Sequence, residues 1–259
     1  MIKVNQICVR FPKAEGRFIL KKEYQQVLYD VSFDVKEGEC LGILGESGSG
    51  KSTLGYALSS LLEPFKGTIA IDGVELYKKE HSLDPGVLAV VFQDYTTSVN
   101  SRFTVRDIIN ESFIVLQRRI KERIAVDKEA IRLLELVGLG EDFLYRYPHQ
   151  LSGGQLQRVC IARAIAVQPK VILFDEAISS LDAHTQVQIM DLLKDIKKQY
   201  NFTYIFITHD LPSVTYICDK VLFLYQGHVE EILPVSQIGC ATSDYAKSLL
   251  HSILDIKIE

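Results

Sequence analysis

The sequence predicts an α/β fold in which strands and helices alternate around a phosphate-binding loop. A glycine-rich segment, 45–52, fits the pattern G-x-x-x-x-G-K-[ST] and lies between a strand-like and a helix-like run. Short β-branched or aromatic runs return at 171–174, 204–208 and 221–225, and helical segments separate the first two. Such alternation is typical of a parallel sheet. Residues 97–165 have helical character and are expected to form an inserted subdomain.

The amino-terminal part, 1–40, is predicted to be rich in strands. Residues 2–10 and 27–35 alternate apolar and polar side chains, as half-buried strands do. A polar, lysine-rich connector, 12–26, joins them and is expected to be exposed. Residues 67–73 are predicted to form a strand that enters a tight Asp-Gly turn.

The glycine-rich loop predicts a specific chemistry. Glycines let the backbone curl so that successive N–H groups point at phosphate oxygens, and the following helix adds its positive amino-terminal end. Lys51 would reach the β- and γ-phosphates, and the Ser52 hydroxyl would ligate Mg²⁺. The alternative is a glycine-rich turn without a ligand, but every fixed position is filled and both flanks fit. We therefore expect the chain to bind a nucleoside triphosphate. The predicted contacts are Gly45, Glu46, Ser47, Gly48, Ser49, Gly50, Lys51, Ser52 and Thr53.

Bulk composition narrows the class of protein. Apolar residues make up 47% and charged residues 24% of the 259 residues, which is ordinary for a globular protein. The net charge of −4 argues against nucleic acid as a partner. No apolar run is long enough to span a bilayer, and the first residues lack the apolar stretch of a signal peptide. We expect a cytosolic protein whose membrane attachment depends on a partner. Five cysteines without C-x-x-C spacing predict reduced, mostly buried thiols.

Two carboxylates follow a predicted buried strand. The apolar run 171–174 leads directly into Asp175 and Glu176. A strand that ends in acids places Asp175 at the carboxyl edge of the sheet, beside the phosphate loop. There Asp175 can hold Mg²⁺ through water, and Glu176 can polarise the attacking water. The alternative, in which Glu176 is only a carboxylate at a helix start, remains open.

The segment Leu151-Ser152-Gly153-Gly154-Gln155 precedes another helical stretch. In isolation Ser152 would be interpreted as a helix N-cap followed by loop glycines. The order of phosphate loop, L-S-G-G-Q and hydrophobic-Asp-Glu, however, resembles the ATP-binding-cassette (ABC) family over nearly the whole chain. The resemblance implies a P-loop NTPase (RecA-like) core with an N-terminal β subdomain and an inserted α-helical subdomain.

Three further positions match motifs of that family. Gln93 follows a predicted strand like the family's glutamine loop, Ser180-Leu181-Asp182 follows the acid pair, and His209 ends a strand like the family's switch histidine. The resemblance implies that Gln93, Glu176 and His209 are catalytic and that Mg²⁺ is held by Ser52, Gln93 and Asp175. It also implies nucleotide contacts from Ser152, Gly153, Gly154, Gln155 and Asp182.

The family stacks an aromatic side chain on adenine. Phe11 best matches that position, and Tyr24 is the second candidate. Either ring is alternatively an ordinary packing aromatic.

A finer resemblance points to importer ATPases of the oligopeptide, dipeptide and nickel group. Segment 91–105 resembles their glutamine-loop region, and 155–160 with Ala177 is most similar to the nickel-import members. Residues 244–250 resemble a short C-terminal extension, so we expect a nucleotide-binding domain over 1–235 and an extension over 236–259. Tyr95 and Ser101 depart from the family, which often has proline there.

The resemblance implies two ATPase subunits, identical or paralogous, that sandwich Mg·ATP head to tail. It also implies transmembrane permease subunits, indirectly a substrate-binding protein, and a peripheral position at the cytoplasmic face of the membrane. The expected cargo is nickel or a metal chelate, with oligopeptides or dipeptides as the alternative. A third interpretation, an ABC ATPase of translation or DNA repair, is disfavoured because such proteins usually carry two cassettes or a long coiled coil. A binding-only, regulatory cassette is disfavoured by the intact motif residues.

Overall fold

The computed structural model describes residues 1–13, 23–78 and 83–254. The chain divides into two compact units. The first unit comprises Met1–Leu83 and Phe206–Glu259, and the second comprises Asp84–Ile205. The boundary between them falls inside strand β8 (Thr203–Thr208). Each unit is described by itself below.

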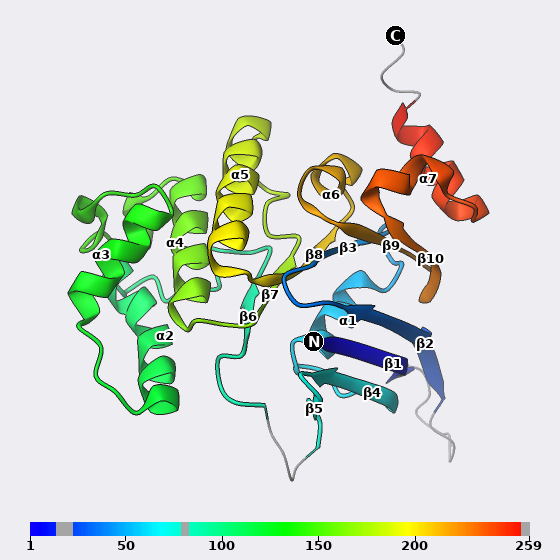
Figure 1. The fold of residues 1–259 in the computed structure, drawn as a ribbon, viewed down its shortest axis with the longest axis horizontal. Coiled ribbons are helices and arrows are strands. Elements are labelled where there is room, and N and C mark those ends of the chain that lie inside the picture. The colour runs from blue at the N-terminus through cyan, green and yellow to red at the C-terminus, as the bar shows by residue number, and fades with distance from the viewer. Residues whose placement is uncertain (14–22, 79–82, 255–259) are drawn as a thin grey trace. The chain divides into compact units, whose positions relative to one another are not determined.

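The first unit contains a four-stranded antiparallel sheet in the order β2-β1-β4-β5 (Figure 1). Apolar side chains such as Ile2, Val4 and Ile69 are buried on it. Asp72 and Gly73, which both have positive φ angles, form the predicted tight turn between β4 and β5. The strands are β1 (Ile2–Pro12), β2 (Tyr24–Val35), β4 (Lys66–Ile71) and β5 (Val74–Glu75).

The first hairpin is longer than the sequence predicts. Pro12 pairs with Tyr24, so the ends of the expected connector 12–26 belong to the strands. Backbone pairing in an antiparallel ladder tolerates polar side chains on both faces, so side-chain alternation underestimates the strand length. Residues 14–22 of the expected connector lie outside the described residues.

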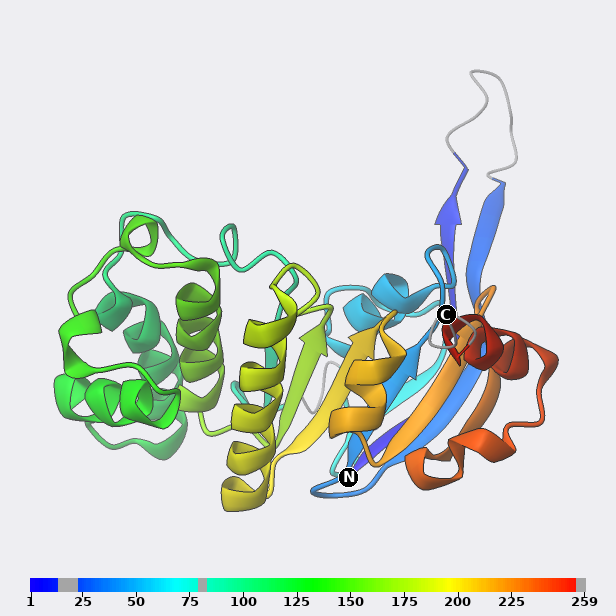
Figure 2. The same cartoon turned by 90° about the horizontal axis from the view of Figure 1, so that it is seen from above.

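A second group of strands in the first unit leads to the phosphate loop. Strand β3 (Cys40–Leu44) runs parallel to β9 (Lys220–Tyr225), which pairs antiparallel with β10 (His228–Pro234). All five residues of β3 are buried, as expected for a strand covered on both faces. Helix α6 (Leu211–Ile217) covers one face (Figure 2), and a Cβ added at Gly42 would lie 2.8 Å from Val214 Cγ1.

Three further elements complete this unit. Helix α1 (Lys51–Leu58) begins directly after the phosphate loop and buries Leu54 and Ala57. The chain after β10 forms the 3₁₀ helix η3 (Val235–Cys240) and helix α7 (Asp244–Leu254). Helix α7 contacts β10 and lies beside it in both views (Figures 1 and 2).

The second unit combines a parallel strand pair with four helices (Figure 1). Strand β6 (Leu88–Val91) pairs with β7 (Val171–Asp175) through Ala89 opposite Ile172. The first three helices pack on one another through buried side chains such as Ile108, Leu134 and Val159. The helices are α2 (Val105–Ile120), α3 (Val126–Leu136), α4 (Gly153–Ala166) and α5 (Ala183–Tyr200), with 3₁₀ turns η1 (Glu141–Phe143) and η2 (Pro148–Gln150).

Helix α4 begins at Gly153, although two glycines occupy its first turn. Glycine disfavours helices, but a side-chain cap at Ser152 satisfies the first free N–H groups and lets the helix start at Gly153. Helix α3 buries Ala130, Leu133 and Leu134, which lie at helical spacing in the sequence.

The cysteine prediction is confirmed. All five are free, and Cys8, Cys40, Cys160 and Cys218 are buried whereas Cys240 is exposed. In the described part of the chain, no helix is both long and apolar enough to cross a bilayer.

Candidate active site

The phosphate loop connects the buried end of β3 to the first turn of α1. Two of its glycines are required by geometry. Gly50 has a φ of 104°, which other residues rarely adopt, and a Cβ there would lie 2.8 Å from Leu28 Cδ2. A Cβ at Gly45 would lie 2.3 Å from the carbonyl oxygen of Leu224 on β9. The loop therefore curls tightly against its own strands.

A buried cation lies inside this loop. Lys51 is 5% exposed, and its Nζ donates hydrogen bonds to the carbonyl oxygens of Gly45 at 2.7 Å and Glu46 at 2.8 Å. Ser49 is also buried, and its Oγ has no hydrogen-bond partner among the described residues. A buried ammonium and an unsatisfied hydroxyl in the same loop fit a phosphate group, which accepts from both. Ser52 is exposed on the first turn of α1.

The two adenine-stacking candidates face different surroundings. Phe11 and Tyr24 are both exposed near the end of the first hairpin, where Pro12 pairs with Tyr24. The guanidinium of Arg10 lies 4.4 Å from the centre of the Tyr24 ring and so occupies one of its faces. No ring contact involves Phe11 within the described residues, which favours Phe11 as the free platform.

His209 also belongs to the first unit. It is exposed and follows the last residue of β8, Thr208. The next residue, Asp210, caps α6 by accepting a hydrogen bond from the Ser213 N–H at 2.8 Å. The strand end and the helix cap thus fix the backbone on both sides of His209.

The segment 151–155, called the signature segment below, lies in the second unit, at the amino-terminal end of α4. Ser152 Oγ accepts from the Gln155 N–H at 3.3 Å, and Gln155 Oε1 accepts from the Ser152 N–H at 2.9 Å. This reciprocal capping box bears out the N-cap interpretation of Ser152. It leaves the backbone of Gly153 and Gly154 at the helix start, where a helix favours anions.

Two side chains that the sequence did not identify cover these glycines. A Cβ at Gly153 would lie 2.5 Å from the Tyr95 hydroxyl, and a Cβ at Gly154 would lie 2.7 Å from Thr185 Cγ2. Packing within the second unit is therefore one reason why both positions hold glycine and not a residue with a Cβ. The signal for Tyr95 was its departure from the proline that related sequences often have; no sequence signal marked Thr185.

A polar hollow of about 340 Å³ opens at this point of the second unit. It gathers the predicted Ser152, Gly153, Gly154, Gln155 and Asp182 in one place. The remaining lining residues are Tyr95, Arg158, Ser180, Leu181, Thr185 and Gln188.

Asp182 has a structural partner in this hollow. Its carboxylate accepts from the Thr185 N–H at 2.9 Å and from Thr185 Oγ1 at 2.7 Å, which caps α5. These hydrogen bonds lower the pKa of Asp182, so the carboxylate is ionised at neutral pH. Because Thr185 also covers Gly154, Asp182 helps to position the signature segment.

The acid pair ends β7 in a strained turn. Asp175 is the last strand residue, and Glu176 has a φ of 47°, in the left-handed region that a residue with a side chain rarely adopts. Both the N–H and the hydroxyl of Ser179 donate to the Glu176 carbonyl oxygen, at 3.2 and 2.9 Å. Such strain is common at functional sites, and here it fixes the direction of the Cα–Cβ bond of Glu176.

The segment after Gln93 is fastened to α4. Gln93 is exposed beyond β6, and the Asp94 carboxylate closes the next turn by accepting from Thr96 and Thr97, which lowers its pKa to about 2. Arg163 of α4 donates to the Ser98 carbonyl oxygen at 2.6 Å. The glutamine-loop region and the signature helix thus behave as one structural element.

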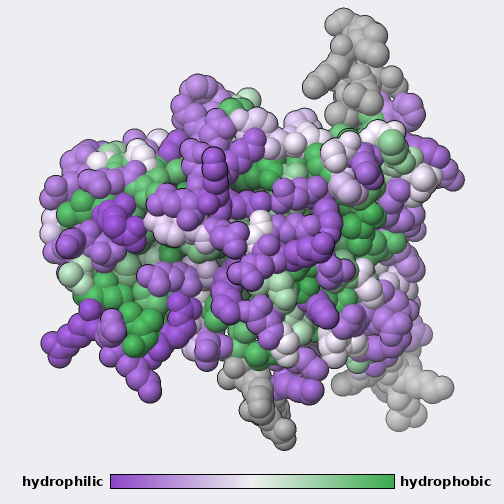
Figure 3. Space-filling model, in the orientation of Figure 1, coloured by the Kyte–Doolittle hydropathy of each residue, from purple (hydrophilic) through white to green (hydrophobic). Residues whose placement is uncertain are grey.

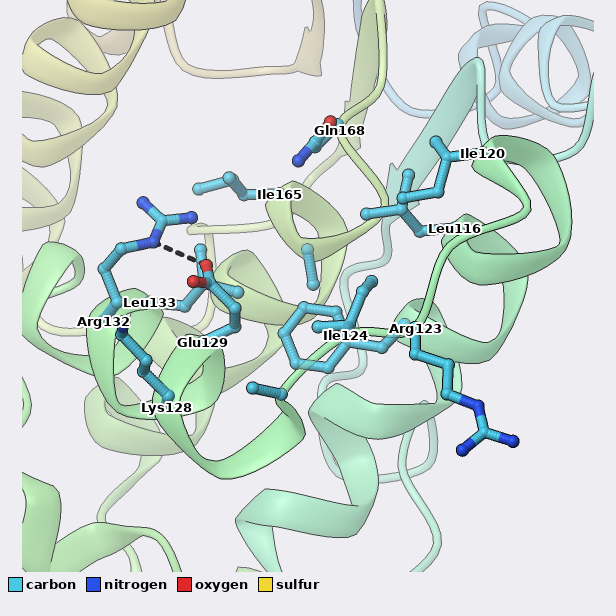
Figure 4. A pocket seen from close by; sticks show the side chains of 13 residues that line it. Leu116, Ile120, Arg123, Ile124, Lys128, Glu129, Arg132, Leu133, Ile165 and Gln168 are labelled. Carbon is cyan, nitrogen blue, oxygen red and sulfur yellow. Dashed lines mark hydrogen bonds and ion pairs between the residues drawn. The ribbon is translucent and has the colours of Figure 1, made fainter.

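The same unit has a second, more apolar hollow of about 380 Å³ (Figure 4). Side chains of α2, α3 and the end of α4 line it, among them Leu116, Leu133 and Ile165. Arg132 and Glu129 form an ion pair at 2.8 Å on its wall, whereas Arg123 points away from it. Figure 3 shows an apolar area over α2, and two isoleucines of that helix, Ile114 and Ile120, are exposed.

Comparison with known proteins decides the family. A family model described as ABC transporter matches residues 28–179, more than half of the chain. This chain belongs to the ABC transporter family. The predicted α/β cassette fold is confirmed, because the chain superimposes on a dimeric ATP-binding cassette bound to ADP and Pi in a post-hydrolysis state. The TM-score is 0.75 at 29% identity, over 91% of this chain and 99% of that one.

Two relatives specify the group within the ABC family. The chain is 40% identical to the metal-staphylopine import system ATP-binding protein of Staphylococcus aureus, over 98% of this chain and 99% of that protein. It is also 40% identical to a putative oligopeptide transport ATP-binding protein of Bacillus subtilis, over 98% of this chain and 76% of that protein. The predicted ATP-hydrolysing subunit of an importer is thereby confirmed. The relatives do not single out nickel.

The contact between Tyr95 and Gly153 yields a stability prediction. Gly153→Ala is expected to lower the free energy of unfolding by about 1–2 kcal/mol, because the new methyl group overlaps the Tyr95 hydroxyl. In a Tyr95→Phe background the same substitution should cost less, since the ring carbon is 3.3 Å from that methyl position. Urea unfolding of the four proteins measures this coupling.

Gly239→Ala is the matched control, because nothing lies within 4 Å of a Cβ at that position. It should leave the free energy of unfolding nearly unchanged. Strictly additive effects of the Gly153 and Tyr95 substitutions would contradict the contact.

Proposed function

We propose that this ABC ATPase couples hydrolysis of Mg·ATP to import of a metal chelate, as one of two ATPase subunits that bind nucleotide between them. The observation that carries the proposal is the polar hollow at the start of α4. The hollow presents backbone and hydroxyl groups of Ser152, Gly153 and Gly154 at a helix amino terminus, an arrangement suited to phosphate. The dimeric form of the solved relative supports a pair of ATPase subunits. The family resemblance implies that they pair head to tail, so that this hollow meets the phosphate loop of the other subunit.

The residues of the phosphate loop bind and orient the nucleotide in this proposal. Lys51 exchanges its loop carbonyls for phosphate oxygens, and the buried Ser49 hydroxyl gains a partner. Phe11 stacks on the base. The oxygen donors of Ser52, Gln93 and Asp175 suit Mg²⁺, which prefers such ligands alongside substrate phosphates. When bound, Mg²⁺ neutralises charge on the β- and γ-phosphates.

Hydrolysis is assigned to the acid pair and the two polar residues at strand ends. Glu176 orients and polarises the attacking water, and its fixed backbone sets the point from which the side chain extends. His209 and Gln93 contact the γ-phosphate side of the nucleotide. Both are exposed at the ends of strands, where parallel α/β folds place their ligands.

Replacing the proposed base separates binding from turnover. Glu176→Gln keeps the shape of the side chain but removes the charge that polarises water, so hydrolysis should fall by about 100-fold or more while ATP binding persists. Phosphate release measures turnover, and size-exclusion chromatography with ATP should show an accumulated dimer.

Glu141→Gln is the control for this variant, since it removes an exposed carboxylate of the same unit without touching the site. It should hydrolyse ATP at the normal rate. Normal turnover by Glu176→Gln would show that Glu176 is not the base.

We propose further that permease subunits dock on the second unit, over segment 94–115 and the neighbouring apolar hollow. The ATPase would then lie at the cytoplasmic face of the membrane, held by its partners. The exposed isoleucines of α2 and the hollow between the three helices supply apolar contact area. The hydrogen bond from Arg163 to the Ser98 carbonyl oxygen would transmit movement of the permease to α4, which begins in the signature segment.

Two arginines in this segment have different surroundings. Arg106 forms ion pairs with Asp107 and Asp127 and so ties α2 to the start of α3. Arg102 is exposed and forms no ion pair within the described residues. Arg102 is therefore the better probe of docking, because its replacement leaves the packing of the unit intact.

Charge reversal at Arg102 tests the docking surface. Arg102→Glu should reduce substrate uptake by the assembled transporter several-fold and leave ATP binding unchanged, because a like charge at an interface weakens association. Lys198→Glu makes the same change on the exposed face of α5 and should transport normally. Cysteines placed along 94–115 should cross-link to a permease; cross-links only from other segments would refute the assignment.

The cargo is proposed as Ni²⁺ or a related metal chelate. Support comes from the resemblance of 155–160 and Ala177 to nickel-import ATPases, and from the staphylococcal relative named for metal-staphylopine import. Among the described residues, no three His, Cys, Asp or Glu side chains are grouped to hold a metal. His149, near the signature, stacks on Tyr147 with ring centres 5.7 Å apart.

Peptide import is the second candidate, supported by the relative in Bacillus subtilis. Deleting the gene distinguishes the two. Lower cellular nickel and lower nickel-dependent activity, both restored by excess Ni²⁺, are expected for the metal chelate. Normal nickel with impaired growth on dipeptides would move the assignment to peptides.

A further inference from the structure

The chain that follows β10 is fastened to that strand by a carboxylate. Glu231 of β10 accepts hydrogen bonds from the N–H and hydroxyl of Thr242 and from the N–H of Ser243, at 2.9–3.0 Å. These donors lower the pKa of Glu231, so it remains ionised and keeps all three bonds at neutral pH. Helix α7 therefore starts at a fixed position beside β10 (Figure 2).

Tyr245, in the first turn of α7, reaches the phosphate loop. Its ring stacks on that of Tyr225, at the end of β9, with centres 4.4 Å apart and an angle of 26°. Its hydroxyl oxygen accepts a hydrogen bond from the N–H of Glu46 at 3.1 Å. Burial raises the pKa of Tyr245, so the phenol is neutral at ordinary pH.

Glu46 is held on both sides of its backbone. Its N–H donates to Tyr245, and its carbonyl oxygen accepts from the Lys51 ammonium at 2.8 Å. Binding of a phosphate draws the ammonium toward the ligand, because Lys51 is the cation of the loop. The contact of Glu46 with Tyr245 does not compete with phosphate for the ammonium and can persist in both states.

We propose that Tyr245 is a positioning residue that holds the first turn of the phosphate loop, so that the C-terminal extension sets the affinity for nucleotide. This inference rests on the proposed binding of ATP by that loop. Tyr245 touches backbone at the start of the loop and none of the residues assigned to hydrolysis. Its loss should therefore weaken binding and leave the rate at saturating ATP unchanged, because an ordered loop costs less conformational entropy to bind.

Tyr245→Phe is the decisive variant, because it keeps the ring that stacks on Tyr225 and removes only the acceptor of the Glu46 bond. Nucleotide titration of the full chain should give a Kd for ATP roughly three- to tenfold higher, the range expected from one hydrogen bond. Hydrogen exchange at the Glu46 amide should speed up, and the melting temperature should change little. In the assembled transporter, KM for ATP should rise with kcat unchanged.

Tyr225→Phe is the matched control. It also removes one hydroxyl from the stacked pair, but among the described residues that hydroxyl accepts only from the side chain of Gln226, at 3.1 Å. Its Kd for ATP and its Glu46 exchange rate should equal those of the wild type.

The outcomes separate this inference from the proposed function. If the wild-type chain fails to bind ATP, the proposed function is wrong. If the wild type binds ATP and Tyr245→Phe binds it equally well, with unchanged Glu46 exchange, the positioning role of Tyr245 is refuted. A fall in kcat at unchanged KM would also refute it, because it would place Tyr245 in the hydrolytic step.

Discussion

The buried ammonium of Lys51 constrains the backbone of the phosphate loop and its packing in the first unit. A charge removed from water costs several kcal/mol unless hydrogen bonds compensate, and here the carbonyls of Gly45 and Glu46 supply them. To aim those carbonyls inward the loop must turn back on itself, which requires the left-handed Gly50 and brings Gly45 against the backbone of β9. Because Lys51 is already buried, a phosphate that binds in the loop does not have to remove water from this ammonium.

The second unit prepares its part of the site by different means. Ser152 and Gln155 cap α4, and the half-buried Gly153 and Gly154 are covered by Tyr95 and Thr185. Tyr95 belongs to the segment that Arg163 fastens through Ser98, and Thr185 is held by Asp182. A displacement of either segment would change what lies over the signature backbone. The glutamine-loop region, the signature and the turn after the acid pair are thus mechanically linked within one unit.

Sequence reasoning succeeded where a short local pattern has one structural solution. The phosphate loop, the strand that ends at Asp175 and the helix α3 follow from glycine geometry and from apolar periodicity. It failed where partners are distant in the sequence. The contacts of Tyr95 with Gly153 and of Tyr245 with Glu46 join residues far apart in the chain, and no local pattern encodes them. Likewise the capping box that starts α4 outweighs the low helix propensity of two glycines.

Asp182 and Glu176, two carboxylates of the proposed site, differ in how the fold constrains them. Asp182 caps the amino terminus of α5 by accepting a hydrogen bond from the Thr185 N–H, so it stabilises the second unit itself. Glu176 instead has a strained backbone, which costs about 1–3 kcal/mol and persists because Ser179 and the buried Ala177 and Ile178 fix the turn. Strain at Glu176 fixes the direction of its Cα–Cβ bond, and burial of Lys51 holds its ammonium inside the loop, before nucleotide binds. Little binding energy is then needed to order either group, and in the proposed dimer the remainder is available to close the two subunits around ATP.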